Sequence, residues 1–349
     1  METKIYRIDS ADISEEIIAE AGEIIKQGGL VAFPTETVYG LGGDAFNPES
    51  SRKIYAAKGR PSDNPLIVHI SALDDLERLV KNIPDNAHRL IEAFWPGPLT
   101  IIFNKKEEVP KETTGGLDTV AVRFPSDPIA RRFITAAGGF VAAPSANISG
   151  RPSPTNGKYV VEDMNSRIDM ILYGDDAEIG LESTIVDVTT EIPVILRPGY
   201  ITEADLAGVC GSVDTDKTIL SDASGVAPKA PGMKYRHYAP KGKLVIVEGE
   251  PDKVVRYIND EVRKDIAEGF KTGVIATDET VSSYKADVVF SAGSESNKEQ
   301  VAHRLFSILR AFDDENVDKM YSVSFADDGL GMAVMNRLLK AAGHNVVKL

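Results

Sequence analysis

The sequence predicts an α/β protein with two domains, in which a larger first domain carries a twisted, mixed sheet and a smaller second domain is Rossmann-like. Three observations support this expectation. The chain has 349 residues, 42% of them hydrophobic, so it can bury the cores of two domains. Short apolar, β-branched runs alternate with stretches of helical periodicity along most of its length. Residues 211–242 interrupt this alternation with Ser, Asp, Gly, Pro and Lys, which predicts a long linker between domains at 1–210 and 243–349.

The elements of the first domain follow from local patterns. Its strands are expected at short runs of β-branched and aromatic residues. Its first helix should begin after Ser14 and end before Gly28, because these are typical capping residues. The connections between strands vary in length, so we expect a mixed sheet rather than a plain doubly wound one. The expected strands are 4–8, 30–33, 66–70, 99–103, 119–124, 140–143, 170–173, 184–188 and 194–196, and the expected helices are 14–27, 48–57, 84–94 and 127–137.

The second domain shows a regular alternation of strands and helices, typical of Rossmann-like βαβ units. Gly329-Leu-Gly331 imitates the first half of a dinucleotide-binding motif, but the rest of the motif is missing. We therefore interpret it as a tight helix start and expect no organic cofactor. The expected strands are 244–247, 273–276, 288–290 and 321–325, and the expected helices are 252–268, 298–312 and 332–342.

Composition excludes several classes of function. The net charge of −14 argues against a broad electrostatic grip on nucleic acid. No apolar run approaches the roughly 20 residues that a membrane-spanning helix needs, and the N-terminus lacks the pattern of a signal peptide. Cys210 is the single cysteine, which excludes internal disulfides and multi-cysteine zinc sites. We expect a cytoplasmic protein with no membrane partner and no strong direct binding of nucleic acid.

Three turn-rich segments bring polar and charged side chains to the ends of predicted strands. Pro34-Thr-Glu-Thr-Val-Tyr39 offers hydroxyls and a carboxylate, and Lys58-Gly-Arg60 offers two cations between a helix and a strand. The stretch from Ala143 to Pro152 adds two hydroxyls, an amide and a guanidinium. Each segment alone is compatible with ordinary turn chemistry, but together they indicate an anion site.

These segments, with Val122-Arg-Phe-Pro125 and Gly180-Leu-Glu-Ser-Thr-Ile-Val-Asp187, resemble the YrdC domain. Beyond them, residues 230–240 and the second domain are similar to the longer Sua5 form of the threonylcarbamoyl-AMP synthase family, so the resemblance spans almost the whole chain. It implies a nucleotidyltransferase that condenses L-threonine, bicarbonate or CO2, and ATP into threonylcarbamoyl-AMP and pyrophosphate. The product would serve the threonylcarbamoyladenosine modification of tRNA, through a downstream threonylcarbamoyl transferase complex.

The resemblance also assigns roles to individual residues. It implies no dedicated metal ligands, because the expected Mg2+ would be held by the ATP phosphates. The residues implied at the reacting phosphates, as the catalytic set, are Lys58, Arg60, Ser145 and Asn147. The residues implied around ATP are Lys58, Arg60, Ser62, Thr119, Ser145, Asn147, Arg151, Arg197 and His237. The residues implied around threonine are Thr35, His69, Arg123, Ala143 and Ser183.

Some of these residues also allow a structural interpretation. Taken alone, His69 fits a core histidine on a strand, and Glu182 fits a turn cap. We expect Lys58 and Arg60 to be exposed loop cations whose removal leaves the fold intact. The basic and aromatic segment around His237 is unusual for a spacer, so we expect it to close over the active site.

Two other functions would also account for part of the sequence. A binding module for structured RNA is the alternative, suggested by the basic loops and by the destination of the product, although the acidic composition counts against it. Carbamoyl transfer in hydrogenase maturation uses a related domain, but it also requires cysteine-rich zinc fingers, which one cysteine cannot build.

Overall fold

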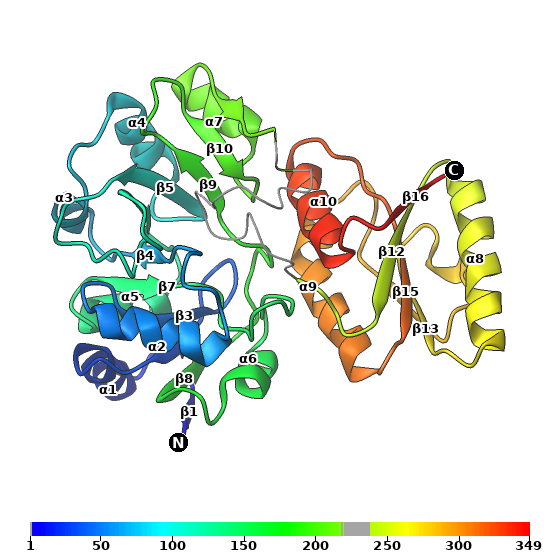
Figure 1. Ribbon diagram of the computed structural model, residues 1–349, viewed down its shortest axis with the longest axis horizontal. Helices are drawn as coiled ribbons and strands as arrows, with labels where there is room; N and C mark the ends of the chain where they lie inside the picture. The colour runs from blue at the N-terminus through cyan, green and yellow to red at the C-terminus, as the bar shows by residue number, and fades with distance from the viewer. Residues whose placement is uncertain (1, 218, 220–237) are drawn as a thin grey trace. The chain divides into compact units, whose positions relative to one another are not determined.

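The computed structural model of the protein describes residues 2–217, 219 and 238–349 (Figure 1). The chain forms two compact units. Among the described residues, the first unit holds 2–149, 153–217 and 219, and the second holds 150–152 and 238–349. Each unit has its own sheet with helices, which confirms the predicted α/β class. The domain limits at 210 and 243 stay a prediction. Within the described residues, no helix combines the length and the apolar character that crossing a membrane requires.

The first unit contains short strands and helices close to those expected from the sequence. Its strands are β1 (Lys4–Arg7), β2 (Val31–Phe33), β3 (Gly40–Asp44), β4 (Ile67–His69), β5 (Leu99–Asn104), β6 (Thr119–Arg123), β7 (Val141–Ala143), β8 (Met170–Tyr173), β9 (Thr184–Asp187), β10 (Val194–Arg197) and β11 (Asp214–Thr215). Its helices are α1 (Glu15–Lys26), α2 (Pro48–Lys58), α3 (Leu76–Leu79), α4 (Asp85–Phe94), α5 (Pro128–Ala136), α6 (Gly157–Met164) and α7 (Glu203–Cys210), with a 3-10 turn η1 (Leu73–Asp75).

These strands form one mixed sheet, as the irregular connections predicted. Their order in the described part of the chain is β1-β8-β2-β3-β7-β4-β6-β5-β9-β10-β11. Strand β6 pairs in parallel with β4 and antiparallel with β5. In the register of these pairs, Arg123 at the end of β6 lies between His69 and Thr100. The topology thus brings three distant parts of the sequence to one point of the sheet.

Strand β3 was not expected from the sequence, because its residues are Gly-Leu-Gly-Gly-Asp and glycine is depleted in strands. The structure gives a packing reason for these glycines. A Cβ on Gly40 would lie 2.9 Å from Cζ of Phe33, and one on Gly42 would lie 2.7 Å from Cγ1 of Val141. Side chains at these two positions would collide with β2 and β7, so close packing requires glycine here.

Two helix ends follow from capping chemistry. Ser14 caps α1 by accepting a hydrogen bond from the backbone N–H of Ile17. Gly59 ends α2 in the left-handed conformation, with φ 63° and ψ 35°. This turn leaves Lys58 as the last helical residue and sends the chain directly into the loop that carries Arg60.

The second unit has a purely parallel sheet, in agreement with the Rossmann-like prediction. Its elements are β12 (Lys243–Glu248), α8 (Pro251–Ala267), β13 (Thr272–Ala276), the 3-10 turn η2 (Val281–Ser283), β14 (Val288–Ser291), α9 (Lys298–Asp314), β15 (Lys319–Val323), α10 (Leu330–Ala341) and β16 (Val346–Lys348). The strand order is β14-β13-β15-β12-β16. Figure 1 shows α8 on one face of this sheet and α9 and α10 on the other.

Candidate active site

The predicted phosphate-binding loops meet at Lys58. Its Nζ donates hydrogen bonds to the backbone oxygens of Ser145 and Asn147, each at 2.5 Å, and to Oδ1 of Asn147 at 3.3 Å. The Ser145 hydroxyl also donates to Asn147 Oδ1, at 2.5 Å. The structure therefore joins the end of α2 to the loop after β7, although 87 residues separate Lys58 from Ser145.

The expectation that Lys58 and Arg60 are exposed loop cations is wrong. Their exposed fractions are 2% and 9%. Arg60 donates from Nε to the backbone oxygen of Asn64 at 3.2 Å and from Nη2 to that of Pro65 at 3.0 Å. Both cations stabilise carbonyl groups of the loops around them, so removing either would leave buried polar groups without partners. Their removal should therefore affect stability as well as ligand binding.

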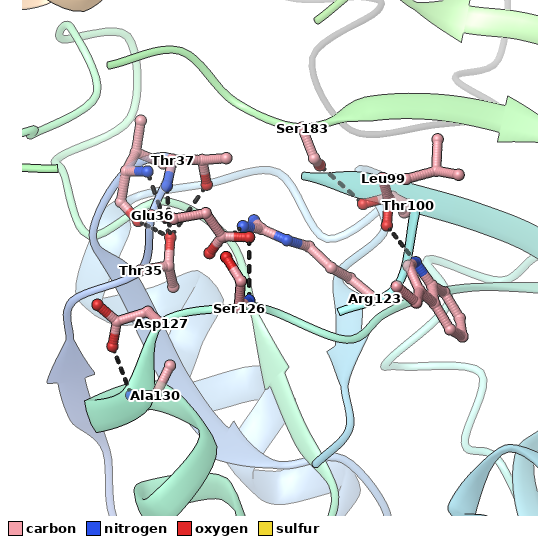
Figure 2. Close-up of polar contacts among 12 residues, drawn as sticks. Thr35, Glu36, Thr37, Leu99, Thr100, Arg123, Ser126, Asp127, Ala130 and Ser183 are labelled. Carbon is pink, nitrogen blue, oxygen red and sulfur yellow. Dashed lines mark hydrogen bonds and ion pairs between the residues drawn. The ribbon is translucent and has the colours of Figure 1, made fainter. Parts of the chain in front are cut away.

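The residues predicted to bind threonine lie around a buried ion pair. Nη2 of Arg123 lies 2.8 Å from Oε2 of Glu36, and both side chains are about 95% buried, with exposed fractions of 4% and 5%. The backbone N–H of Ser126 donates to the other carboxylate oxygen, Oε1, at 3.2 Å. Nη2 of Arg123 and Oε2 of Glu36 contact each other in the ion pair, and Nε of Arg123 has no hydrogen-bond partner among the described residues. Figure 2 shows the guanidinium pointing toward the Glu36 carboxylate.

Hydroxyl groups lie on two sides of Arg123 (Figure 2). On one side, the Thr35 hydroxyl donates to the backbone oxygen of Val38 at 2.5 Å. On the other side, the hydroxyls of Ser183 and Thr100 lie 2.7 Å apart. Arg197 donates to Ser183 from Nε, to the backbone oxygen at 3.0 Å, and from Nη2, to the hydroxyl at 3.1 Å. A residue predicted for ATP and one predicted for threonine are therefore in direct contact.

His69 is fully enclosed by the fold. Burial, reinforced by the positive charge of Arg123, lowers the pKa of His69 to about 3, so the ring is neutral at physiological pH. Its Nδ1 lies 3.1 Å from the backbone oxygen of Ile67, and its ring meets that of Phe33 edge to face at 6.1 Å. Ala143, at the end of β7, is also buried and lies opposite Ile67 in the β4–β7 register.

Two predicted ATP residues of the first unit, Thr119 and Ser62, are not among these contacts. Thr119 begins β6, four residues before Arg123, which corresponds to roughly 13 Å along a strand. Ser62 lies exposed in the loop after Arg60. Arg151 belongs to the second unit, where its Nη2 lies 3.9 Å from Oδ2 of Asp313. His237, with the segment expected to close over the site, lies outside the described residues.

Glu36 and Asp127 are candidate site residues that the sequence reasoning did not assign. Asp127 caps α5 by accepting a hydrogen bond from the backbone N–H of Ala130 at 2.8 Å. Burial raises the pKa of Asp127 to about 6, despite this hydrogen bond, and the negative charge of Glu36 adds to the increase. A carboxylate between two threonines after a strand could have drawn attention to Glu36. Its partner Arg123, 87 positions away, could not be read from the sequence.

Other acidic residues make structural contacts. Glu182 accepts a hydrogen bond from the Ser153 hydroxyl at 2.6 Å and is buried. Within the part of the chain that the structure describes, no three His, Cys, Asp or Glu side chains cluster in a way that could hold a metal ion. The described residues around Arg123 thus offer cations, hydroxyls and one carboxylate, which suits an anionic or zwitterionic ligand.

Comparisons with known proteins agree with the motif resemblance. A family described as "Telomere recombination" matches residues 23–199, and one described as "Threonylcarbamoyl-AMP synthase, C-terminal domain" matches residues 201–343. The threonylcarbamoyl-AMP synthase of Pyrococcus abyssi is 47% identical over 337 residues, which are 97% of each chain. The chain belongs to the threonylcarbamoyl-AMP synthase family.

Other members of the threonylcarbamoyl-AMP synthase family match the chain from end to end. The Bacillus subtilis enzyme is 44% identical over 352 residues, covering 100% of both chains. A crystal structure of P. abyssi Sua5 complexed with L-threonine superimposes with a TM-score of 0.94 at 45% identity, and covers 99% of this chain and 100% of that one. The two-domain Sua5 form inferred from the motifs is confirmed.

Proposed function

We propose that this chain condenses L-threonine, bicarbonate or CO2, and ATP into threonylcarbamoyl-AMP and pyrophosphate, with the reacting groups held by the first unit. Family membership supports the reaction, and L-threonine is the ligand in the solved P. abyssi relative. The observation in this chain that carries the proposal is the buried Arg123–Glu36 pair, in which Nε of Arg123 has no hydrogen-bond partner among the described residues.

The ion pair has the chemistry of an amino-acid site. A guanidinium binds a carboxylate through two parallel N–H groups, and in Arg123 the Nε has no partner while Nη2 contacts Glu36. Oε2 of Glu36, which contacts Nη2 of Arg123, would also accept a hydrogen bond from the substrate amine. A buried polar atom left unsatisfied costs about 1–3 kcal/mol. Threonine, which brings a carboxylate and an amine together, would give Nε of Arg123 a partner and its own amine a counter-charge.

The neighbouring hydroxyls would complete the threonine site. Thr35 and Ser183 lie on opposite sides of Arg123 and can each hydrogen-bond a polar atom of the substrate (Figure 2). His69, neutral because of its burial, would add a hydrogen-bonding ring without adding charge. A positive His69 would compete with Arg123 for the carboxylate, so its neutral state favours a single binding mode.

The nucleotide would bind at the loops that Lys58 joins. Lys58 places a positive charge beneath the Ser145–Asn147 turn, and Arg60 and Arg197 add two further cations in the first unit. The threonine amine would be carboxylated to a carbamate, and a carbamate oxygen would attack the α-phosphate of ATP and expel pyrophosphate. This step needs no protein nucleophile, because positioning and charge neutralisation supply most of the catalysis in such reactions.

The contact between Arg197 and Ser183 would couple the two substrates. Arg197 donates twice to Ser183, so a phosphate drawn to this guanidinium would lie next to a threonine held by the Ser183 hydroxyl. Mg2+ would arrive with ATP, held by its phosphate oxygens. The product would pass to a threonylcarbamoyl transferase complex acting on tRNA. We expect no strong direct binding of nucleic acid, since the net charge is −14.

Release of pyrophosphate from ATP tests the proposal. The full chain should release it only when threonine and bicarbonate are both present. Arg123→Met, which keeps the aliphatic part of the side chain but removes its charge, should abolish threonine-dependent release of pyrophosphate while circular dichroism shows a folded protein. Equal release with either co-substrate omitted would exclude the proposed reaction. An RNA-binding module would instead shift structured RNA in a salt-dependent manner and release no pyrophosphate.

A further inference from the structure

A cavity lies wholly within the second unit. Its volume is about 430 Å³, which is in the range of small-molecule sites. It is lined by residues at and just beyond the carboxyl ends of three neighbouring strands: Val247 to Gly249 at β12, Thr277 after β13, and Val323 to Asp327 at β15. None of these residues belongs to the proposed synthase site.

The topology of the sheet places this cavity at a switch point. From β12 the chain passes through α8 to β13, toward one edge of the sheet, and from β15 it passes through α10 to β16, toward the other edge. Figure 1 shows these two helices on opposite faces. Strands β12 and β15 are neighbours and their connections leave toward opposite faces of the sheet (Figure 1), which opens a crevice above their carboxyl ends. Parallel α/β sheets bind ligands in this crevice.

Tyr284 gives an independent sign of a missing ligand. It lines the cavity and is 7% exposed, and its hydroxyl is near the Thr280 hydroxyl without a well-aligned hydrogen bond to it or to any other described residue. Buried tyrosine hydroxyls normally find a partner. A ligand with a hydrogen-bonding group would supply one, and its binding would remove the cost of the unsatisfied hydroxyl.

The charges around the cavity indicate the charge of the ligand that it would bind. Glu248, Glu295 and Asp327 line it, and the described lining residues include no Lys, Arg or His. Lys348 pairs with Glu248 at 3.1 Å, which leaves Glu295 and Asp327 to attract a positive group. Neighbouring Lys298 is paired with Asp328. Phosphates and other anions are therefore disfavoured at this site.

Apolar side chains form the rest of the wall. Val254, Phe325 and Met335 line the cavity beside the strand ends. We propose that the cavity binds a small organic cation, a monoamine with an apolar body, whose ammonium lies at Glu295 and Asp327 and whose body packs against these side chains. The Tyr284 hydroxyl then pairs with a polar group of the ligand. This inference does not depend on the proposed synthase activity.

Three probes of one size class test the choice of ligand. Tyramine is a cation, tyrosol is its neutral alcohol and 4-hydroxyphenylacetate is an anion, and all three share a phenol ring. Calorimetry or ligand-observed NMR with the full chain should show millimolar or tighter binding of tyramine, weaker binding of tyrosol and none of the anion. Equal binding of all three probes, or no binding of tyramine at millimolar concentration, would overturn the proposal.

Variants locate the binding. Glu295→Gln combined with Asp327→Asn, both exposed positions, should weaken tyramine binding by about twofold to tenfold while tyrosol binding is unchanged. Tyr284→Phe should weaken both probes, with thermal unfolding used to verify the fold. The matched control Glu268→Gln removes an exposed carboxylate outside the cavity and should change nothing. Tyramine affinity unaffected by the double variant would place the binding elsewhere and refute the site.

Discussion

Replacing Glu36 with glutamine separates two roles of the buried ion pair. In the free protein the substitution leaves the Arg123 guanidinium without its counter-charge, 2.8 Å away and 4% exposed. Breaking a buried pair by removing one partner costs about 3–5 kcal/mol. Glutamine keeps an oxygen that can accept from the Ser126 N–H, so we expect a loss of about 3 kcal/mol in the free energy of unfolding.

The same substitution should weaken threonine binding for a different reason. In the proposed site, Oε2 of Glu36 accepts a hydrogen bond from the substrate ammonium. Glu36→Gln removes this hydrogen bond to a charged group, which is worth about 1.5–3 kcal/mol. That is roughly a tenfold to hundredfold increase in the dissociation constant of threonine. The carboxylate of threonine would still bind Arg123.

Calorimetry with threonine and 3-hydroxybutanoate measures the effect of the amine alone, because the second ligand keeps the carboxylate and hydroxyl but lacks the amine. Glu36→Gln should weaken threonine binding and leave 3-hydroxybutanoate binding unchanged or tighter. The control Glu49→Gln breaks the exposed pair with Arg52 and should alter neither. Equal weakening of both ligands would show that Glu36 only orients Arg123, and would refute the amine contact.

Three further predictions follow from other contacts. Lys58→Met should weaken ATP binding and lower the free energy of unfolding by about 3 kcal/mol in urea titrations, because three hydrogen bonds to the Ser145–Asn147 turn are lost. Unchanged stability would show that Lys58 serves only to bind the ligand. The pKa of Asp127 is raised to about 6, so the folded state binds this proton more tightly than the unfolded state does. The free energy of unfolding should therefore fall by up to about 3 kcal/mol as pH rises from 4 to 6. Asp127→Asn, which can still cap α5, should flatten this pH dependence, and an unaltered slope would exclude Asp127 as its source. Gly42→Ala should destabilise the first unit by about 1–3 kcal/mol in thermal or urea unfolding, since its Cβ would meet Val141, and a neutral effect would show that β7 can shift.

Local chemistry in the sequence was enough to predict much of the fold. Ser14 and Gly28 marked the ends of α1 to within one residue, because capping depends on neighbouring residues only. The Gly40–Asp44 strand was missed because its glycines are required by Phe33 and Val141, which reach it through tertiary packing. Propensity alone cannot anticipate such contacts.

In the candidate site, too, local patterns in the sequence indicated some residues but not the contacts that they make in the fold. The motifs drew attention to Lys58 and Arg123, since cations beside turn residues are visible in the sequence. Their burial was not visible, because it depends on carbonyl groups of distant loops that accept their hydrogen bonds. The pairing of Arg123 with Glu36 depends on the tertiary fold, because Glu36 lies between β2 and β3 whereas Arg123 ends β6, and β7 and β4 lie between β3 and β6 in the sheet. Candidate residues could be named from the sequence, but their contact partners could not.

The identity of the adenylated product tests the central proposal most directly. The full chain is incubated with ATP, Mg2+, threonine and isotopically labelled bicarbonate, and the nucleotide products are analysed at once by mass spectrometry. We predict an AMP adduct that carries threonine and one labelled carbon, formed in proportion to pyrophosphate and absent with Arg123→Met. An adduct of threonine and AMP without the labelled carbon, or pyrophosphate release with no threonine in the product, would contradict the proposed reaction.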